Sequence, residues 1–597
     1  MEKILFLISE ESKNFNLSLD KIEELLHNGC NVTVISLSAL TSIELKKRKI
    51  EYKTPSYYSD DFNHCELDRI SLEFAQNWYK PFEEDITYRG INLGEMLEYD
   101  FYFLFVDVLR GFRIVERILS SECPNIIYIP NDLSLNDPNF VCYETLPMIL
   151  QKFPYQKPVK IISLNEISSN IQNKSIQKYF SFEFRDKLLY FYMRSVNFYL
   201  THVLYYFKPQ IVFFWNVYAY RNISQNLKLK GYHPARVFPL KIYNKYTEKK
   251  INEINNICIR LKHTNFSEVK LDYNGYNISF FLEDYFEKVF KKFGDLIQYI
   301  EWAKQITHKF SQCMIVAMED ITPINRAVIR FFKINDMNSL VIQHGLVSKD
   351  MAGFGAMPIE ATVQAVWGEN SLKWHYKRGN KSQVITGNPG FDPILTYKTK
   401  FNREKVFRNL GLDLTKKIIL ITTERFAGIT SDYTTDDEEE IIRSTLKSLK
   451  NFDEVQKIVK LHPGHQEKYA RIIRNIAIEE DIDLMIFSDF LWDLILVCDV
   501  LITFASTTGL EAMLFGKAVV AVGDKEEVDS YVKDIAAVGV SDYNELAPTI
   551  KSIISGKLKE ESLHSIDHLI YQNCFLNDGK SSERVANLII SLINNQD

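Results

Sequence analysis

A short turn rich in hydroxyl groups is the clearest candidate ligand site in this sequence. Ser506, Thr507 and Thr508 lie in residues 498–523, between an apolar segment predicted as a strand and a helix stopped by Gly516. The N-terminus of a helix presents unpaired backbone N–H groups and the positive end of its dipole, so this turn suits an anionic ligand such as a phosphate. The same residue types also cap helices, and this alternative stays open.

A histidine-proline loop lies upstream of that turn. Residues 458–461 are predicted as a strand that leads into His462, Pro463 and Gly464, before a helical run at 467–477. Open α/β sheets bind ligands in loops that follow strand ends. The two loops together therefore predict one phosphate site.

A second histidine and two acids follow other predicted strands. His344 comes after strand 340–343, and Glu319 and Asp320 come after strand 314–317. Histidine has a reference pKa of about 6.5, which suits a general base. His344 is thus a candidate base, although it is also compatible with a structural or substrate-binding role. Glu319 and Asp320 are the rival bases, or else an ordinary helix cap.

Strands and helices alternate along the chain, which predicts an α/β fold with doubly wound sheets. The predicted strands include residues 4–8, 32–36, 126–129, 160–164, 211–215, 314–317, 340–343, 383–386, 418–422 and 518–522. We expect an N-terminal Rossmann-like, acceptor-side domain at 1–386, with a helical insertion around 240–309. A nucleotide-donor domain at 387–580 follows a hinge at 387–389, and a final helix in 581–597 crosses back onto the first domain.

These loops resemble those of GT-B glycosyltransferases, in which two Rossmann-like domains face a cleft. The resemblance rests on the His-Pro loop and on the hydroxyl turn followed by Gly-Leu-Glu-Ala-Met. It implies that His462, Pro463, Gly464, Ser506, Thr507 and Thr508 hold the phosphates of a nucleotide donor, and that Glu511 holds its ribose. An acid in the first helical turn is also favoured by the helix dipole alone. Arg425 follows strand 418–422 and either adds positive charge near the phosphates or is an ordinary exposed arginine.

The sequence Gln343-His344-Gly345, taken with His462-Pro463-Gly464, is similar to the two-histidine pattern of CDP-glycerol glycerophosphotransferases and capsule glycosyltransferases. This resemblance implies that the first histidine is the base. Residues 383–392 and 418–425 also look like hydrolysing UDP-N-acetylglucosamine 2-epimerases, which share the GT-B fold. The acidic and arginine-rich motifs of those epimerases are replaced here, which disfavours epimerase chemistry.

The composition of the sequence argues against some kinds of binding partner. The net charge of −6 argues against a general nucleic-acid binder, and the eight cysteines are scattered without a metal-ligand or disulfide pattern. We expect no metal, since no Asp-x-Asp motif follows a strand, and no cofactor other than the nucleotide-activated donor. The N-terminus looks like a first strand and not a signal peptide, which favours a cytoplasmic protein. Residues 188–220 are rich in aromatic side chains and could touch a membrane surface.

The sequence therefore predicts a cytoplasmic glycosyltransferase. It would move a sugar or a glycerophosphate from a CMP-, CDP- or UDP-linked donor to a surface or capsular glycan, or to a lipid-linked acceptor. Two alternatives remain, which are a nucleotide-sugar 2-epimerase or hydrolase and a non-catalytic glycan-binding partner in an assembly complex.

Overall fold

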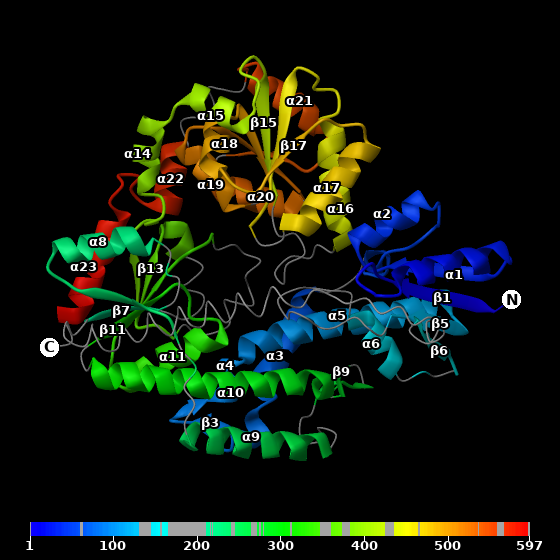
Figure 1. Ribbon diagram of the computed structural model, residues 1–597, viewed down its shortest axis with the longest axis horizontal. Coiled ribbons are helices and arrows are strands. Elements are labelled where there is room, and N and C mark those ends of the chain that lie inside the picture. Colours follow the sequence, from blue (N-terminus) through cyan, green and yellow to red (C-terminus); the bar gives the residue numbers. More distant parts are fainter. Residues whose placement is uncertain are drawn as a thin grey trace.

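The protein contains three parallel β-sheets, which lie around a common centre with helices on their faces (Figure 1). The computed structural model describes residues 2–59, 64–130, 145–153, 155, 158–164, 210–214, 217, 219–239, 241, 245–263, 271–273, 276–278, 280–310, 313–346, 360–372, 382–423, 435–463, 466–504, 506–523, 525–534, 537–557 and 566–594. The chain begins and ends on opposite sides of the molecule.

The N-terminal sheet has four strands in the order β2-β1-β5-β6. Its elements are β1 (Lys3–Ile8), α1 (Phe15–His27), β2 (Asn31–Ser36), α2 (Ala39–Lys47), α5 (Glu98–Glu122), β5 (Ile126–Ile129), α6 (Thr145–Lys152) and β6 (Lys160–Ser163). The central strand β1 is almost wholly apolar because helices cover both faces of the sheet.

The middle sheet has six strands in the order β14-β13-β12-β11-β7-β8. Its elements are β7 (Ile211–Phe214), α8 (Tyr220–Leu229), β8 (Pro234–Val237), β11 (Met314–Ala317), α11 (Pro323–Ile334), β12 (Ser339–Ile342), β13 (Val363–Val366) and β14 (Gln383–Ile385). Every residue of β7, β11, β12 and β13 is buried, as expected for strands of a parallel sheet that is covered on both faces.

The C-terminal sheet also has six parallel strands, in the order β17-β16-β15-β18-β19-β20. Its strands are β15 (Lys417–Thr422), β16 (Val455–Lys460), β17 (Met485–Phe487), β18 (Val500–Thr503), β19 (Ala518–Val522) and β20 (Val538–Val540). The surrounding helices are α14 (Pro393–Lys400), α15 (Arg403–Leu410), α16 (Thr435–Ser448), α17 (Gln466–Glu479), α18 (Leu491–Val497), α19 (Thr507–Leu514), α20 (Lys525–Asp534), α21 (Tyr543–Ile554) and α22 (Ile566–Cys574). This strand order is the one found in Rossmann folds, and its direction reverses between β15 and β18.

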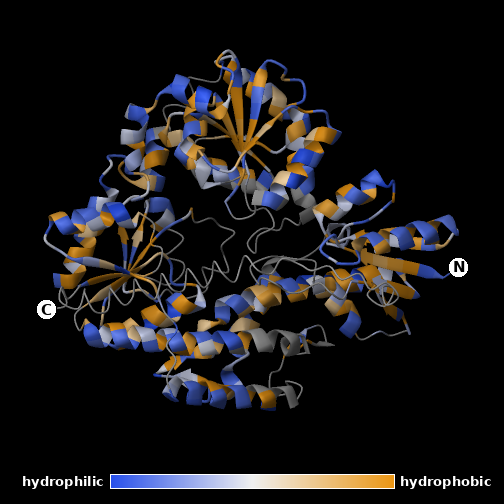
Figure 2. Ribbon diagram, viewed as in Figure 1, coloured by the Kyte–Doolittle hydropathy of each residue, from blue (hydrophilic) through white to orange (hydrophobic). Residues whose placement is uncertain are grey.

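A helical layer joins the N-terminal and middle sheets. It contains α3 (His64–Asn77), α4 (Leu93–Met96), α9 (Lys245–His263) and α10 (Phe280–Lys309), with the hairpins β3 (Thr87–Tyr88) to β4 (Ile91–Asn92) and β9 (Asp272–Tyr273) to β10 (Tyr276–Asn277). Its helices carry hydrophobic and hydrophilic residues side by side, whereas the sheet strands are mostly hydrophobic (Figure 2). The largest hydrophobic core runs through this layer, so the two sheets share one core.

Two contacts tie the remaining parts together. Helix α23 (Ser581–Asn594) follows the C-terminal sheet in sequence but packs into the core of the middle sheet, beside α8. Helix α2 of the N-terminal sheet places Ala39, Leu40 and Ile43 in the core of the C-terminal sheet, and Lys46 pairs with Glu439 at 2.9 Å. Helix α2 therefore links the N-terminal sheet to the C-terminal core, and α23 returns the chain from the C-terminal sheet to the middle one.

The predicted α/β fold with doubly wound parallel sheets is confirmed. The strands predicted at 126–129, 314–317 and 518–522 have those bounds in the structure. The strands of residues 1–386 are divided between two sheets, where we had expected a single Rossmann-like domain. Most of residues 188–220, which we had considered for membrane contact, lie outside the described part of the chain.

Candidate functional site

The hydroxyl turn lies where the strand order of the C-terminal sheet reverses. Ser506 caps α19, and its side chain accepts a hydrogen bond from the backbone N–H of Thr508 at 3.4 Å. The Thr508 hydroxyl lies 2.9 Å from that of Thr422, at the end of β15. Ligands of open α/β sheets bind outside the carboxyl ends of the strands at such a reversal point. Ser506 therefore acts as a helix cap, since its side chain and its carbonyl accept the N–H groups of Thr508 and Gly509, and the N-terminal end of the α19 dipole lies at this edge.

A glycine and a tyrosine set the shape of this turn. The Tyr531 hydroxyl donates a hydrogen bond to the Ser506 carbonyl at 2.6 Å. A Cβ atom on Gly509 would lie 2.1 Å from that hydroxyl oxygen, so any larger residue would require the Tyr531 side chain to shift. Tyr531 was not identified from the sequence, since it lies 25 residues after Ser506 and belongs to no motif.

The histidine-proline loop follows β16, the neighbour of β15. The backbone N–H of His462 donates to the Thr423 hydroxyl at 2.8 Å, and the N–H of Thr423 donates to the Lys460 carbonyl at 3.0 Å. The side chains of His462 and Pro463 are exposed. The ends of β15 and β16 therefore hold the His-Pro loop beside the hydroxyl turn. Gly464 and Arg425 lie outside the described residues.

Glu511 sits one turn into α19, in an environment that favours its neutral form. Its carboxylate accepts a hydrogen bond from the indole N–H of Trp492. Burial raises the pKa of Glu511 to about 7, although the Trp492 bond and the charge of Lys460 act in the opposite direction. A carboxyl group that titrates near neutral pH can donate or accept hydrogen bonds, which suits contact with sugar hydroxyls. Trp492 and Lys460 were not identified from the sequence.

His344 lies on the middle sheet, directly after β12. Its side chain is exposed, and its Nδ1 lies 3.2 Å from the Met318 carbonyl at the end of β11. Because a carbonyl only accepts hydrogen bonds, Nδ1 carries the proton of the neutral ring and Nε2 keeps its lone pair. This is the orientation that a general base requires.

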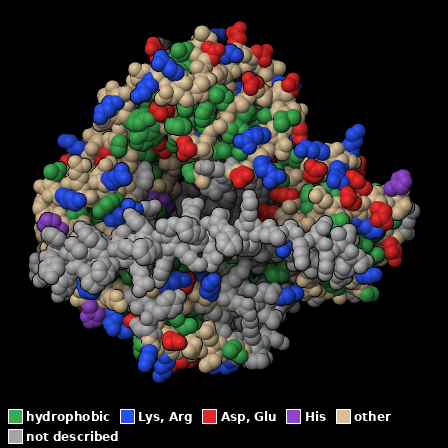
Figure 3. All heavy atoms as spheres, viewed as in Figure 1, with side chains coloured by type: hydrophobic (Ala, Val, Ile, Leu, Met, Phe, Trp, Pro, Cys, Tyr) green, Lys and Arg blue, Asp and Glu red, His purple; other side chains and the backbone are tan. Residues whose placement is uncertain are grey.

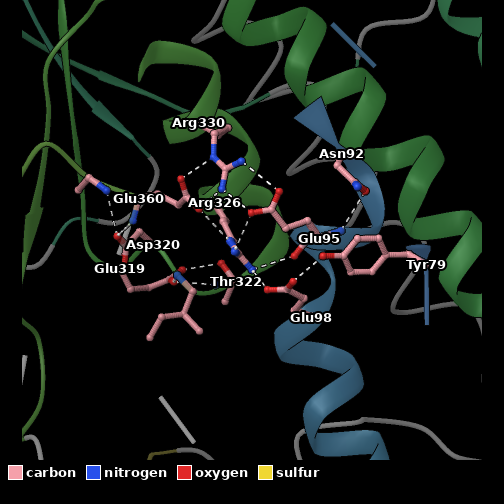
Figure 4. Close-up of polar contacts among 12 residues, drawn as sticks. Tyr79, Asn92, Glu95, Glu98, Glu319, Asp320, Thr322, Arg326, Arg330 and Glu360 are labelled. Carbon is pink, nitrogen blue, oxygen red and sulfur yellow. Dashed lines mark hydrogen bonds and ion pairs between the residues drawn. The ribbon is translucent and has the colours of Figure 1, made fainter. Parts of the chain in front are cut away.

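The carboxylates of the two rival bases accept hydrogen bonds from other parts of the chain. Glu319 accepts hydrogen bonds from the backbone N–H groups of Ile321 and Thr322, at 2.6 and 2.8 Å, and from the hydroxyl of Thr322 at 2.5 Å. Asp320 is 3% exposed and accepts the N–H groups of Glu360 and Ala361, at 2.8 and 3.1 Å (Figure 4). Glu319 therefore stabilises the turn that precedes α11 without capping that helix, and Asp320 holds the segment that leads into β13.

A buried network of arginine–glutamate ion pairs lies next to these two acids (Figure 4). Arg326 of α11 is 2% exposed and bonds to Glu98 at 3.1 Å and Glu360 at 3.2 Å, while Arg330 bonds to Glu95 at 2.6 Å and also to Glu360. Burial raises the pKa of Glu98, whereas the pKa of Glu360 is lowered because hydrogen bonds from Arg330 and Arg326 outweigh its burial. This network joins the helical layer to the middle sheet.

The structure thus assembles two separate groups of predicted residues. His462, Pro463, Ser506, Thr507, Thr508 and Glu511 gather at the carboxyl edge of the C-terminal sheet, and His344, Glu319 and Asp320 at that of the middle sheet. The face drawn in Figure 3 is hollowed between the helices around these two sheets.

The fold defines an α/β protein whose C-terminal sheet has the strand order of a Rossmann fold. Residues 368–591 match the family model described as CDP-glycerol:poly(glycerophosphate) glycerophosphotransferase. The predicted resemblance is confirmed for this part of the chain, which is less than half of its length. The matched segment contains the His-Pro loop, the hydroxyl turn and Glu511, but not His344.

Several solved structures are similar at low sequence identity. A UDP-GlcNAc 2-epimerase from Neisseria meningitidis is 14% identical, covering 64% of this chain and 99% of its own, with a TM-score of 0.39. A glycosyltransferase from Rickettsia africae is 12% identical, covering 64% and 98%, with a TM-score of 0.40. The wall teichoic acid polymerase TagF is 13% identical, covering 65% and 90%, with a TM-score of 0.39. Among curated proteins, no sequence matches this chain.

Two further features concern the described residues alone. None of their helices combines the length and the apolar character needed to cross a membrane. No group of three or more His, Cys, Asp or Glu side chains among them is placed to hold a metal ion.

Proposed function

We propose that this protein is a glycosyltransferase, or a closely related glycerophosphotransferase, that uses a nucleotide-activated donor. The donor is a CMP-, CDP- or UDP-linked sugar or glycerophosphate, and the acceptor is a hydroxyl group of a surface or capsular glycan. The observation that carries the proposal is the grouping of His462 with the hydroxyl turn at the reversal point of a Rossmann-like sheet.

The proposed reaction assigns a role to each edge. The oxygen of the acceptor hydroxyl attacks the donor, and Nε2 of His344 takes the proton of that hydroxyl. The bond between the transferred group and the nucleoside phosphate breaks. The leaving phosphate gains negative charge, which His462 and the positive end of the α19 dipole stabilise. Glu511 binds the ribose hydroxyls, and its pKa of about 7 is compatible with both donating and accepting hydrogen bonds to them.

The sheet arrangement supports a modified division into domains. We propose that residues 210–386 form the acceptor-side domain and residues 387–580 the donor domain, with α23 returning to the first of them. Residues 2–164, with the four-stranded N-terminal sheet, form an added unit in this scheme. Gly387 has a φ of +80° and lies at the junction, where we propose the hinge.

A nucleotide panel tests the donor site. We expect CMP, CDP or UDP to raise the midpoint of thermal unfolding of the wild-type protein, since a ligand that binds only the folded state stabilises it. The His462→Ala variant is expected to lose most of that increase. Absence of any increase with CMP, CDP, UDP and GDP would instead favour a glycan-binding module without catalysis.

Donor turnover tests the reaction. Nucleotide release from CDP-glycerol, UDP-N-acetylglucosamine and a CMP-linked acidic sugar is measured with and without a poly(glycerophosphate) or glycan acceptor. We expect release to depend on the acceptor. Consumption of a donor without acceptor, with a change in sugar configuration or with simple hydrolysis, would favour the epimerase or hydrolase alternative.

A further inference from the structure

The loop that carries His344 is held by a pair of buried side chains from two neighbouring strands. Gln343 is 4% exposed and Trp367, directly after β13, is 1% exposed. The Gln343 side chain accepts a hydrogen bond from the Trp367 backbone N–H at 2.9 Å and donates one to the Gly345 carbonyl at 2.8 Å. The Trp367 indole N–H donates to the Gln343 carbonyl at 2.8 Å.

These three hydrogen bonds surround His344 in the chain. One fixes the carbonyl before it, another fixes the carbonyl after it, and the third ties the Gln343 side chain to β13. The Met318 carbonyl holds the imidazole ring itself from the β11 side. The His344 loop is therefore hydrogen-bonded from the sides of both strands that flank β12, and one nitrogen of the exposed His344 ring contacts the end of β11.

Trp367 also connects this loop to the donor domain. Its ring lies 5.6 Å from that of Phe391 and belongs to the core of the C-terminal sheet, together with Ile394 of α14. The residue that holds the His344 loop thus sits at the seam between the middle and C-terminal sheets. If the donor domain moved at this boundary, the Trp367 indole would move with it and displace the Gln343 carbonyl to which it is hydrogen-bonded.

We propose that Gln343 and Trp367 are positioning residues, which set the orientation of His344 relative to the bound donor. The inference rests on the proposed function of His344 as the base. Misplacing a reacting group by about 1 Å can lower a rate by roughly 100-fold, although the change lies outside the reacting atoms. Neither side chain needs to touch the substrate for this effect.

The main test is Gln343→Leu, which keeps the approximate volume but removes both side-chain hydrogen bonds. We expect kcat for acceptor-dependent nucleotide release to fall roughly 10- to 100-fold. The donor KM is expected to stay within about twofold, since the donor site lies on the other sheet. The Trp367→Phe variant keeps an aromatic ring in the core but loses the indole N–H and the volume of the second ring, while the backbone N–H that Gln343 accepts remains. We therefore expect a smaller fall of roughly 3- to 10-fold.

Two controls separate positioning from general loss of structure. Ser339→Ala removes a buried hydroxyl that contacts Thr362 at the start of β12 and β13, which is the end of these strands away from the His344 loop. We expect kcat to stay within about twofold of the wild-type value. In a His344→Ala background, adding Gln343→Leu should cause no further loss of the residual turnover, because residues that act as a unit are not additive.

The possible outcomes are distinct. Full kcat in Gln343→Leu, or an equal fold-loss in the presence and absence of His344, would overturn the inference while leaving the proposed function standing. If Gln343→Leu does not fold, Trp367→Phe and its combination with His344→Ala decide the question by the same criteria. Full activity in His344→Ala alone would remove the base assignment itself, and the positioning role with it.

Discussion

The carboxyl edges of the middle and C-terminal sheets use their polar side chains in different ways. On the middle sheet, Glu319 and Asp320 accept hydrogen bonds from backbone N–H groups of their own chain, and of these two acids and His344 it is the His344 side chain that is exposed. On the C-terminal sheet, hydroxyl groups and Glu511 gather around one helix N-terminus. An acid after a strand is thus no sign of catalysis by itself, because backbone N–H groups near strand ends need acceptors too.

The strand orders of the two sheets add to this contrast. In the C-terminal sheet the hydroxyl turn lies between β15 and β18, where the order reverses. In the middle sheet the order reverses between β7 and β11, yet His344 follows β12, which lies on the far side of β11. The reversal point therefore locates the proposed donor site, while the position of the proposed base depends on the loop after a different strand.

The largest expected effect comes from removing the His344 ring. His344→Ala should lower kcat for transfer by roughly 10²- to 10⁴-fold, the usual contribution of a general base. Nucleotide binding, measured by calorimetry, should remain unchanged, because the donor site lies on the C-terminal sheet. An exposed histidine at the end of α1 provides the control, and His27→Ala should leave kcat unaltered. Loss of nucleotide binding in His344→Ala would contradict the division of roles between the two sheets.

The next effect concerns stability. Arg326→Leu leaves the buried carboxylates of Glu98 and Glu360 without one of their cationic partners, and we expect the free energy of unfolding to fall by about 3–5 kcal/mol. Urea unfolding measures this change. The exposed pair of Arg69 and Glu73 is a matched control, since Arg69→Leu should change the free energy of unfolding by less than about 1 kcal/mol. Equal effects would show that burial of the network does not matter.

A third variant tests the donor edge by overpacking. Gly509→Ala places a methyl group against the Tyr531 hydroxyl, and we expect a loss of stability of about 3 kcal/mol with weakened nucleotide binding. Adding Tyr531→Phe removes the clashing oxygen and should restore part of both. Gly294→Ala in α10 is the control, because a Cβ there would meet its nearest neighbour at 3.8 Å. A Gly509→Ala protein that binds nucleotide as tightly as the wild type would contradict the assignment of this turn.

The smallest effect is a pH dependence at Glu511. Burial raises the pKa of Glu511 in the folded protein to about 7, above the ordinary value for a glutamate, so the folded state binds the proton more tightly than the unfolded state. The stabilisation is complete below pH 4.5 and is lost as the pH rises through 7. We expect Glu511→Gln to remove a decrease of about 1–2 kcal/mol across that interval, measured by urea unfolding at several pH values. Parallel profiles for the two proteins would show that Glu511 is not perturbed by burial.

Much of the fold could be predicted from local patterns of apolar and polar residues in the sequence. Several apolar strands were recognised with their observed bounds, as at β5, β11 and β19. The three-residue strands β17 and β20 were among those that were missed, since so short an apolar run is also compatible with other structure. The division of the first 386 residues into two sheets was also missed, because strand pairing depends on contacts distant in sequence.

The candidate site shows the same limit. The hydroxyl turn and the His-Pro loop were visible because neighbouring residues of the right chemistry follow predicted strands. Trp492, Tyr531 and Thr422 were not, since each reaches the site from another element. The acids at 319 and 320 looked like candidate bases until the structure placed Asp320 beside N–H groups 40 residues further along the chain.

By itself, the sequence determined the α/β class, the strand ends that carry polar residues and the chemistry of each loop, because these follow from hydrophobic periodicity and residue type over short distances. Only the tertiary structure decided which polar groups form hydrogen bonds within the protein and which stay accessible. Hydrogen-bond partners such as Met318 for His344 and Glu360 for Asp320 are brought together by packing between strands, and no local pattern encodes that pairing.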